Sequence, residues 1–163
     1  MDVWVSVFLF VHVMGAIVAF GPTYIFPLIA AASRRDPQHA HFGAGVSELI
    51  SKRVVFPFAL LQGVTGVILI LLVGFDLTAS SSRWLISGIV LYLVAILISI
   101  FVMQPSAERM VELTASPPPM SPEGRPMPSP ELLATGRRLQ LGGTVNGILV
   151  AIVVLLMVTK PSF

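Results

Sequence analysis

The chain has 163 residues, of which 55% are hydrophobic and 11% are charged, with a formal net charge of +2 at pH 7. Soluble domains usually carry about 25% charged residues. This composition and a mean hydropathy of +0.91 therefore exclude a globular protein with a water-facing surface. The absence of cysteine excludes disulfides and cysteine-ligated metals, and the sparse basic residues, without interleaved aromatic residues, argue against binding to nucleic acid.

Four segments lack Asp, Glu, Lys and Arg over lengths that can cross a membrane, and they cover residues 3–33, 54–75, 84–107 and 139–159. About 20 apolar residues cross the hydrocarbon core of a bilayer as a helix. The first segment has no basic leader and is too long to be the core of a cleaved signal peptide. We expect an all-α, integral membrane, antiparallel four-helix bundle forming one domain over residues 1–163, with helices at about 3–32, 47–75, 83–114 and 130–159.

The first two expected helices each carry proline. Pro22 and Pro27 should kink the second half of the first helix, because proline lacks a backbone N–H. Ser47 followed by Glu48 is typical of a helix start, so the second helix should begin near residue 47. Pro57 should then bend it close to the membrane surface.

The third and fourth helices are joined by a proline-rich loop, residues 115–130. The third helix follows the short linker "DLTASSSR" and so lies antiparallel to the second. In the loop, "SPPPMSPEGRPMPSP" has seven prolines in fifteen residues and favours an extended polyproline II chain, which suits docking on another membrane subunit between Pro117 and Pro130. The sequence Ser129-Pro130-Glu131 supplies the cap, proline and acid that open the fourth helix.

Basic residues gather on one side of the expected membrane. Eight of the ten Lys and Arg lie at the ends of or within the first and third loops: Arg34, Arg35, Lys52, Arg53, Arg109, Arg125, Arg137 and Arg138. Only Arg83 and Lys160 lie on the other side. By the positive-inside rule, we expect both loops in the cytoplasm of a bacterium and both termini on the extracytoplasmic side of its inner membrane.

Each expected helix has one face of small or polar residues, and these faces should meet, because close backbone approach and hydrogen bonds drive helix association in lipid. Counting roughly 1.5 Å of depth per residue gives two polar layers. His12, Thr65 and Tyr92 form the outer layer, and Gln62 and Asn146 form a deeper helix-packing pair. The simplest interpretation is two hydrogen-bonded clusters, with His12 near Thr65 or Tyr92 and Gln62 near Asn146.

His12 is the one histidine within an expected span, and an ionisable residue there is a candidate functional site. It could ligate a b-type haem, with Tyr92 and Thr65 nearby and with Gly15 and its small neighbours leaving room for a porphyrin edge. A haem usually needs a second strong ligand, and no methionine lies at the depth of His12. The second ligand would come from another chain. We expect no cofactor, with haem b as the alternative.

A second histidine cluster lies in the first loop. His39 and His41 form an H-x-H motif with Asp36 nearby. Metal sites usually need three or four ligands and supporting hydrogen bonds. We therefore expect a solvated loop and no metal site.

Three stretches resemble an uncharacterised family of small bacterial integral membrane proteins with four spans: "HVMGAIVAFGPTYIFPLIAAAS", "GVTGVILIL" and "VVLLMVTKP". The resemblance covers nearly the whole chain and implies topology, since the family's activity is not established. More distantly, the first helix is similar to that of copper-resistance-D-type proteins and of the small membrane protoporphyrinogen oxidase. In those proteins a histidine precedes an aromatic residue and a glycine by two turns, as His12 precedes Phe20 and Gly21. The oxidase-type families have further intramembrane histidine or basic residues, which this chain lacks.

No pattern for catalysis is present in the sequence: there is no glycine-rich phosphate loop, no nucleophile motif and no carboxylate within a span. We expect a non-enzymatic accessory or scaffold subunit of a larger membrane complex, respiratory or photosynthetic. The alternative is a haem-binding redox protein that uses His12. A small transporter fits less well, because broken helix pairs and charge near the membrane midplane are absent.

Overall fold

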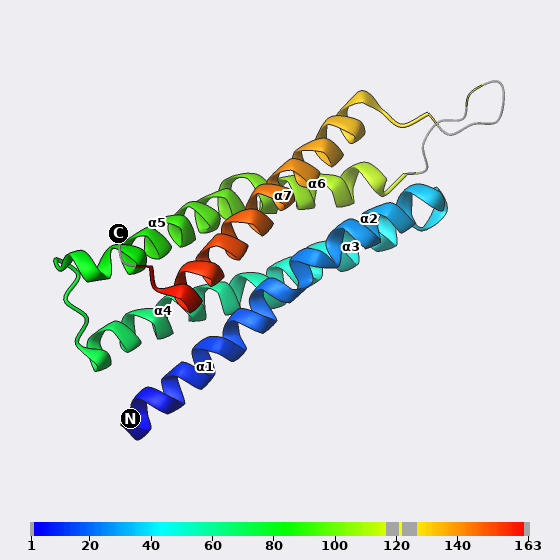
Figure 1. The fold of residues 1–163 in the computed structure, drawn as a ribbon. Coiled ribbons are helices and arrows are strands. Elements are labelled where there is room, and N and C mark those ends of the chain that lie inside the picture. Colours follow the sequence, from blue (N-terminus) through cyan, green and yellow to red (C-terminus); the bar gives the residue numbers. More distant parts are fainter. Residues whose placement is uncertain (1, 117–120, 122–126, 162–163) are drawn as a thin grey trace.

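Four long helices run side by side through the computed structural model (Figure 1). The structure describes residues 2–116, 121 and 127–161, and no strand occurs among them. Each long helix is of a length and hydropathy that can cross a membrane, and the four cover Val3–Arg35, Pro37–Val73, Ser80–Thr114 and Pro130–Thr159. The predicted all-α membrane bundle is confirmed.

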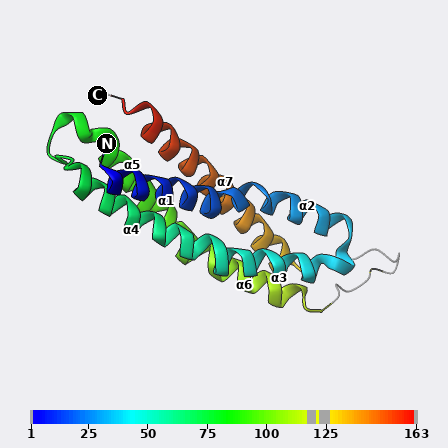
Figure 2. The same cartoon turned by 90° about the horizontal axis from the view of Figure 1, so that it is seen from below.

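Seven α-helical segments build these four helices: α1 Val3–Phe20, α2 Phe26–Arg35, α3 Ala40–Ile50, α4 Phe56–Val73, α5 Arg83–Ile98, α6 Gln104–Thr114 and α7 Pro130–Thr159. The pairs α1–α2, α3–α4 and α5–α6 each form one long helix, and α7 is the fourth. Both chain termini lie at the end where α4 turns into α5, which we call the terminal end (Figures 1 and 2). We call the opposite end, where α2 meets α3, the basic end.

Proline accounts for the interruptions inside the long helices. A 3-10 turn that contains a proline, Gly21–Tyr24, separates α1 from α2, as the sequence predicted. Turns of π-helix, Ser51–Val55 and Ser99–Met103, separate α3 from α4 and α5 from α6. Each π turn directly precedes a segment with proline in its first turn, Pro57 or Pro105. Because a proline ring clashes with the carbonyl four residues before it, the wider turn keeps the helix continuous.

The second long helix begins earlier than the sequence predicted. A 3-10 turn, Pro37–His39, leads directly into α3 at Ala40, because Pro37 can open a helix once Asp36 has left helical geometry. Ser47 lies inside α3, where its hydroxyl donates to the carbonyl of Gly43 at 2.8 Å. The predicted start near residue 47 was therefore wrong, whereas α7 covers the predicted 130–159.

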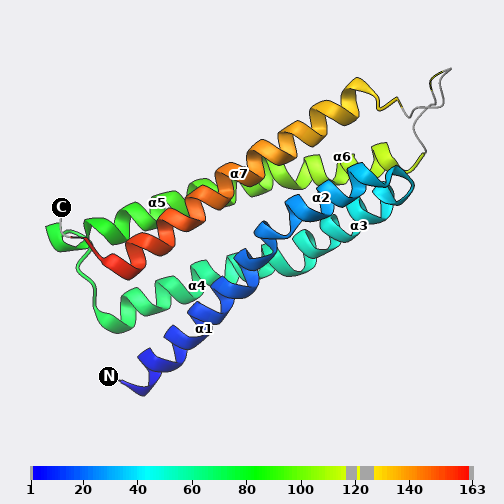
Figure 3. The ribbon, with the colours of Figure 1, turned by 45° about the vertical axis from the view of Figure 1, so that its right-hand side comes forward.

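The four helices pair as two hairpins (Figure 3). α1 packs along α4, and α5 packs along α7, while α3 meets α6 at the basic end. The buried residues are small or polar for the most part, including Ala19, Ala59, Ala95, Gln62, Thr65, Ser106 and Thr135. Many large aliphatic side chains point outward instead. Small residues inside and large apolar residues outside are the reverse of the pattern in soluble proteins. This pattern is expected where lipid surrounds the bundle and small residues allow close helix contact.

Candidate functional site: a polar cluster inside the bundle

His12 lies on the face of α1 that packs against α4, and both of its ring nitrogens have partners on that helix. Its Nδ1 lies 2.9 Å from the hydroxyl oxygen of Thr65, and the side-chain amide of Gln62 lies 2.9 Å from its Nε2. Gln62 and Thr65 are buried within α4. The imidazole is therefore held between two side chains that stand one turn apart on the neighbouring helix.

The network assigns the protonation of the ring. The Thr65 hydroxyl donates to the carbonyl of Leu61 at 2.9 Å, so it is free to accept from His12. The Gln62 amide nitrogen can only donate, so with this nitrogen placed against Nε2 the ring accepts at Nε2 and donates to Thr65 through Nδ1–H. A neutral ring of this tautomer satisfies both nitrogens at once, which is the condition for keeping an imidazole inside a low-dielectric bundle.

Two glycines create the space for this cluster. A Cβ added to Gly66 would lie 3.4 Å from Cε1 of His12, and one added to Gly15 would lie 3.0 Å from Oε1 of Gln62. That Oε1 is buried and has no hydrogen-bond partner. The side chains of His12 and Gln62 thus fill the space that these small residues leave.

Tyr92 belongs to a separate contact. Its hydroxyl donates to the carbonyl of Ala59 at 2.8 Å and so joins α5 to α4. The ring lies over Gly63, where an added Cβ would stand 2.6 Å from the Tyr92 hydroxyl oxygen. The structure therefore brings His12 together with Thr65, while Tyr92 bonds a backbone carbonyl and not the imidazole.

The deeper pair expected from the sequence is not formed. Gln62 bonds His12, whereas Asn146 on α7 donates its amide to the hydroxyl of Ser99 at 2.9 Å. Ser99 in turn donates to the carbonyl of Ala95, at the same distance of 2.9 Å. The expected pairing of Gln62 with Asn146 was wrong because depth along a helix does not fix the direction in which a side chain points.

This geometry does not suit a haem on His12. Iron ligation through Nε2 would displace the Gln62 amide, and ligation through Nδ1 would displace Thr65. The stripe expected to admit a porphyrin edge is closed, since Ala19 is fully buried and Gly15 is covered by Gln62. The arrangement fits a helix-to-helix hydrogen-bond cluster better than an open ligand site.

The two histidines of the H-x-H motif make separate contacts, one local and one with another helix. His39 Nδ1 lies 2.8 Å from the carboxylate of Asp36, and His41 Nδ1 lies 3.2 Å from the carbonyl of Val111 on α6. Among the residues that the structure describes, no three His, Cys, Asp or Glu side chains form a group that could hold a metal ion. The expected solvated loop is not observed at His41, because this residue lies on the helix α3 and its ring contacts α6.

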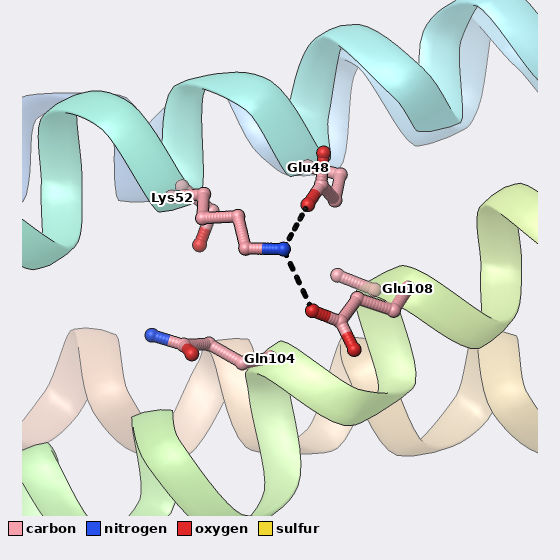
Figure 4. A pocket seen from close by; sticks show the side chains of 6 residues that line it. Glu48, Lys52, Gln104 and Glu108 are labelled. Carbon is pink, nitrogen blue, oxygen red and sulfur yellow. Dashed lines mark hydrogen bonds and ion pairs between the residues drawn. The ribbon is translucent and has the colours of Figure 1, made fainter.

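Sequence reasoning missed a salt bridge that joins the two hairpins. Lys52 reaches Glu48 on α3 at 3.2 Å and Glu108 on α6 at 2.8 Å, beside Gln104 (Figure 4). Lys52 and Glu108 are about half exposed and Glu48 is less so, and ion pairs this open to solvent stabilise a fold only weakly. The four-residue spacing of Glu48 and Lys52 was the available signal, but the partner on α6 is distant in sequence.

A second salt bridge joins the third and fourth long helices. Arg109 on α6 contacts Glu112 at 2.6 Å and Glu131 on α7 at 2.7 Å. Together with the Lys52 pairs, it places ionic contacts between helices at the basic end. The polar cluster around His12 joins helices nearer the terminal end.

Four apolar helices joined internally by hydrogen bonds define a multi-span integral membrane protein of the helical-bundle class. The chain belongs to the family described as "Predicted integral membrane protein (DUF2269)", whose model matches residues 6–161. This confirms the family membership predicted from the sequence. Comparison with curated proteins and with solved structures gave no significant match. The distant similarity of the first helix to that of copper-resistance-D-type proteins and of the small membrane protoporphyrinogen oxidase stays a prediction.

Proposed function

We propose that this protein is a non-enzymatic accessory or scaffold subunit of a larger membrane complex, such as a respiratory or photosynthetic one. The observation that carries the proposal is the length of the helices. The four spans have 33, 37, 35 and 30 residues, which corresponds to about 45–55 Å at roughly 1.5 Å per residue. The hydrocarbon core of a bilayer is only about 30 Å thick.

The excess length extends from the membrane at the basic end. Ion pairs between the helices occur there, at Lys52 and Arg109, and they hold the projecting segments together. Exposed apolar side chains also lie on these segments, including Phe42 on α3 and Leu133 on α7. We take these exposed apolar side chains as contact points for a partner subunit. The loop from Pro117 to Pro130, expected to bind a partner, lies largely outside the described residues.

The proposed orientation places the basic end in the cytoplasm of a bacterium and both termini on the extracytoplasmic side of its inner membrane. The gathering of arginine and lysine at the basic end supports it through the positive-inside rule. In this orientation the projecting helices would meet cytoplasmic or membrane-embedded partner subunits.

Photo-crosslinking from Phe42 tests the proposal. A photo-reactive amino acid at Phe42, in native membranes, should give discrete adducts with another polypeptide. Leu71 on α4 is a matched control, because it is as exposed as Phe42, 75% against 72%, but lies within the membrane-crossing segment. It should give lipid adducts. An absence of polypeptide adducts at Phe42 would contradict the proposal.

The alternative function, a haem-binding redox protein, predicts a different absorption spectrum for the purified protein. We expect no Soret absorption band that depends on His12, because both ring nitrogens are hydrogen bonded to α4. The measurement is the absorption spectrum of the wild type, of His12→Ala and of the control Thr144→Ala, whose hydroxyl bonds only its own helix. A Soret band lost in His12→Ala alone would favour the redox function instead.

A further inference from the structure

An open cleft of about 530 Å³ lies between α7 and the third long helix, on the outside of the bundle. Ile98 and Val102 form one wall, and Leu141 and Val145 on α7 form the other. Arg137 and Arg138, one turn nearer the basic end, line the same cleft. It is therefore an open apolar groove with two guanidinium groups at one end.

The floor of the cleft explains its shape. Gly142 is buried, and a Cβ added there would lie 2.6 Å from the sulfur of Met103. Because Gly142 has no side chain, α7 approaches the π turn Ser99–Met103 closely at this point. The larger side chains on either side then stand apart as walls, and the space between them opens outward.

Arg137 and Arg138 differ from two other basic residues of this end, Lys52 and Arg109. Lys52 and Arg109 are each paired with two carboxylates. Arg137 and Arg138 are exposed, and within the described part of the chain neither forms an ion pair. The nearest acid on α7, Glu131, is bound to Arg109. The cleft therefore carries positive charge that the chain itself does not neutralise.

The depth of the cleft matches the layers of a bilayer. About 20 residues cross the hydrocarbon core. Counted back from the end of α7 at Thr159, that length reaches residue 140, so Leu141 and Val145 lie at acyl-chain depth. Counted from Arg83 at the start of α5, the same length reaches Val102. Arg137 and Arg138 then lie just outside, at the level of the lipid headgroups.

We propose that this cleft binds one anionic phospholipid. Its phosphate would accept hydrogen bonds from Arg137 and Arg138, since guanidinium groups match phosphate oxygens in a bidentate geometry. An acyl chain would lie along Ile98, Val102 and Leu141. Basic pockets between helices at the membrane surface recognise anionic headgroups in this way. The proposal stands on the cleft alone and does not depend on the function proposed above.

Native mass spectrometry of the full chain in detergent tests it, with dioleoyl phosphatidylglycerol and dioleoyl phosphatidylcholine as the two probes. The wild type should retain the anionic lipid at least about tenfold better, which corresponds to about 1.4 kcal/mol. Arg137→Gln/Arg138→Gln should reduce its retention to that of phosphatidylcholine. Ala134→Phe should also reduce it without changing charge, because Ala134 is exposed and lines the cleft.

Arg34→Gln/Arg35→Gln is the matched control, because it removes two adjacent exposed arginines from the last turn of α2 at the same end of the bundle. It should leave retention within about twofold of the wild type. Equal losses in the two double variants would mean general charge attraction and would overturn the proposal, as would no loss in the Arg137 and Arg138 variant. Displacement of the lipid by excess inorganic phosphate, or a polypeptide adduct from a photo-reactive residue at Leu141 in native membranes, would also overturn it. Thermal unfolding of each variant checks that the bundle is intact.

Discussion

Gly63→Ala should destabilise the bundle by about 1–3 kcal/mol, the usual cost of adding a methyl group to a filled interior. The new Cβ would lie 2.6 Å from the hydroxyl oxygen of Tyr92 and 3.2 Å from its Cζ. Tyr92 cannot move aside without losing its hydrogen bond to the carbonyl of Ala59. The contact between α4 and α5 should therefore loosen, which lowers the midpoint of thermal unfolding in detergent followed by circular dichroism.

Two further variants separate this clash from a general effect of losing glycine. Gly45→Ala has no heavy atom within 4 Å of the added Cβ and should be neutral or slightly stabilising. Tyr92→Phe removes the oxygen nearest to the new methyl group, so the double variant Gly63→Ala/Tyr92→Phe should lose less stability than the two single variants added together. Strict additivity would show that the clash is not the cause.

His12→Leu should lower the free energy of unfolding by about 1–3 kcal/mol, the cost of leaving a buried polar group unsatisfied. The Gln62 amide would lose its partner while its Oε1 already has none. Thr65 would lose less, because its hydroxyl still donates to the carbonyl of Leu61. Unfolding in a denaturing detergent, compared with Thr144→Ala as a control, measures the difference.

The double variant His12→Leu/Gln62→Leu gives the sharper test of this cluster. It removes both partners of one hydrogen bond and leaves no unsatisfied amide, so it should be less destabilised than His12→Leu alone. If the double variant loses more stability than the single one, the penalty comes from packing and not from the stranded amide of Gln62.

The sequence was sufficient for features that depend on local chemistry. Uncharged segments of membrane length predicted the four spans, and the break at Gly21–Tyr24 followed from a proline in the first helix. The start of α7 followed from Ser129, whose hydroxyl accepts from the backbone N–H of Leu132 at 3.1 Å. Each of these features is decided within a few neighbouring residues, so no knowledge of the other helices was needed.

The partners of the polar residues could be predicted only in part. Counting residues along a helix gave comparable depths for Gln62 and Asn146, but it did not give the directions in which they point. In the structure they face different neighbours, His12 on α1 and Ser99 at the start of a π turn. The salt bridge between Lys52 and Glu108 was missed for the same reason, since it depends on how the second and third long helices are rotated about their axes.

The two π turns have a consequence for which helices meet. An α-helix rotates by about 100° for each residue, so one additional residue in a turn redirects everything beyond it by that angle. Both middle helices carry such a turn, Ser51–Val55 and Ser99–Met103. On the terminal side of these turns α4 packs on α1 and α5 on α7, while on the other side α3 and α6 pack on each other and keep contacts with α2 and α7. One additional residue in each middle helix thus lets the two hairpins meet along α3 and α6 at the basic end.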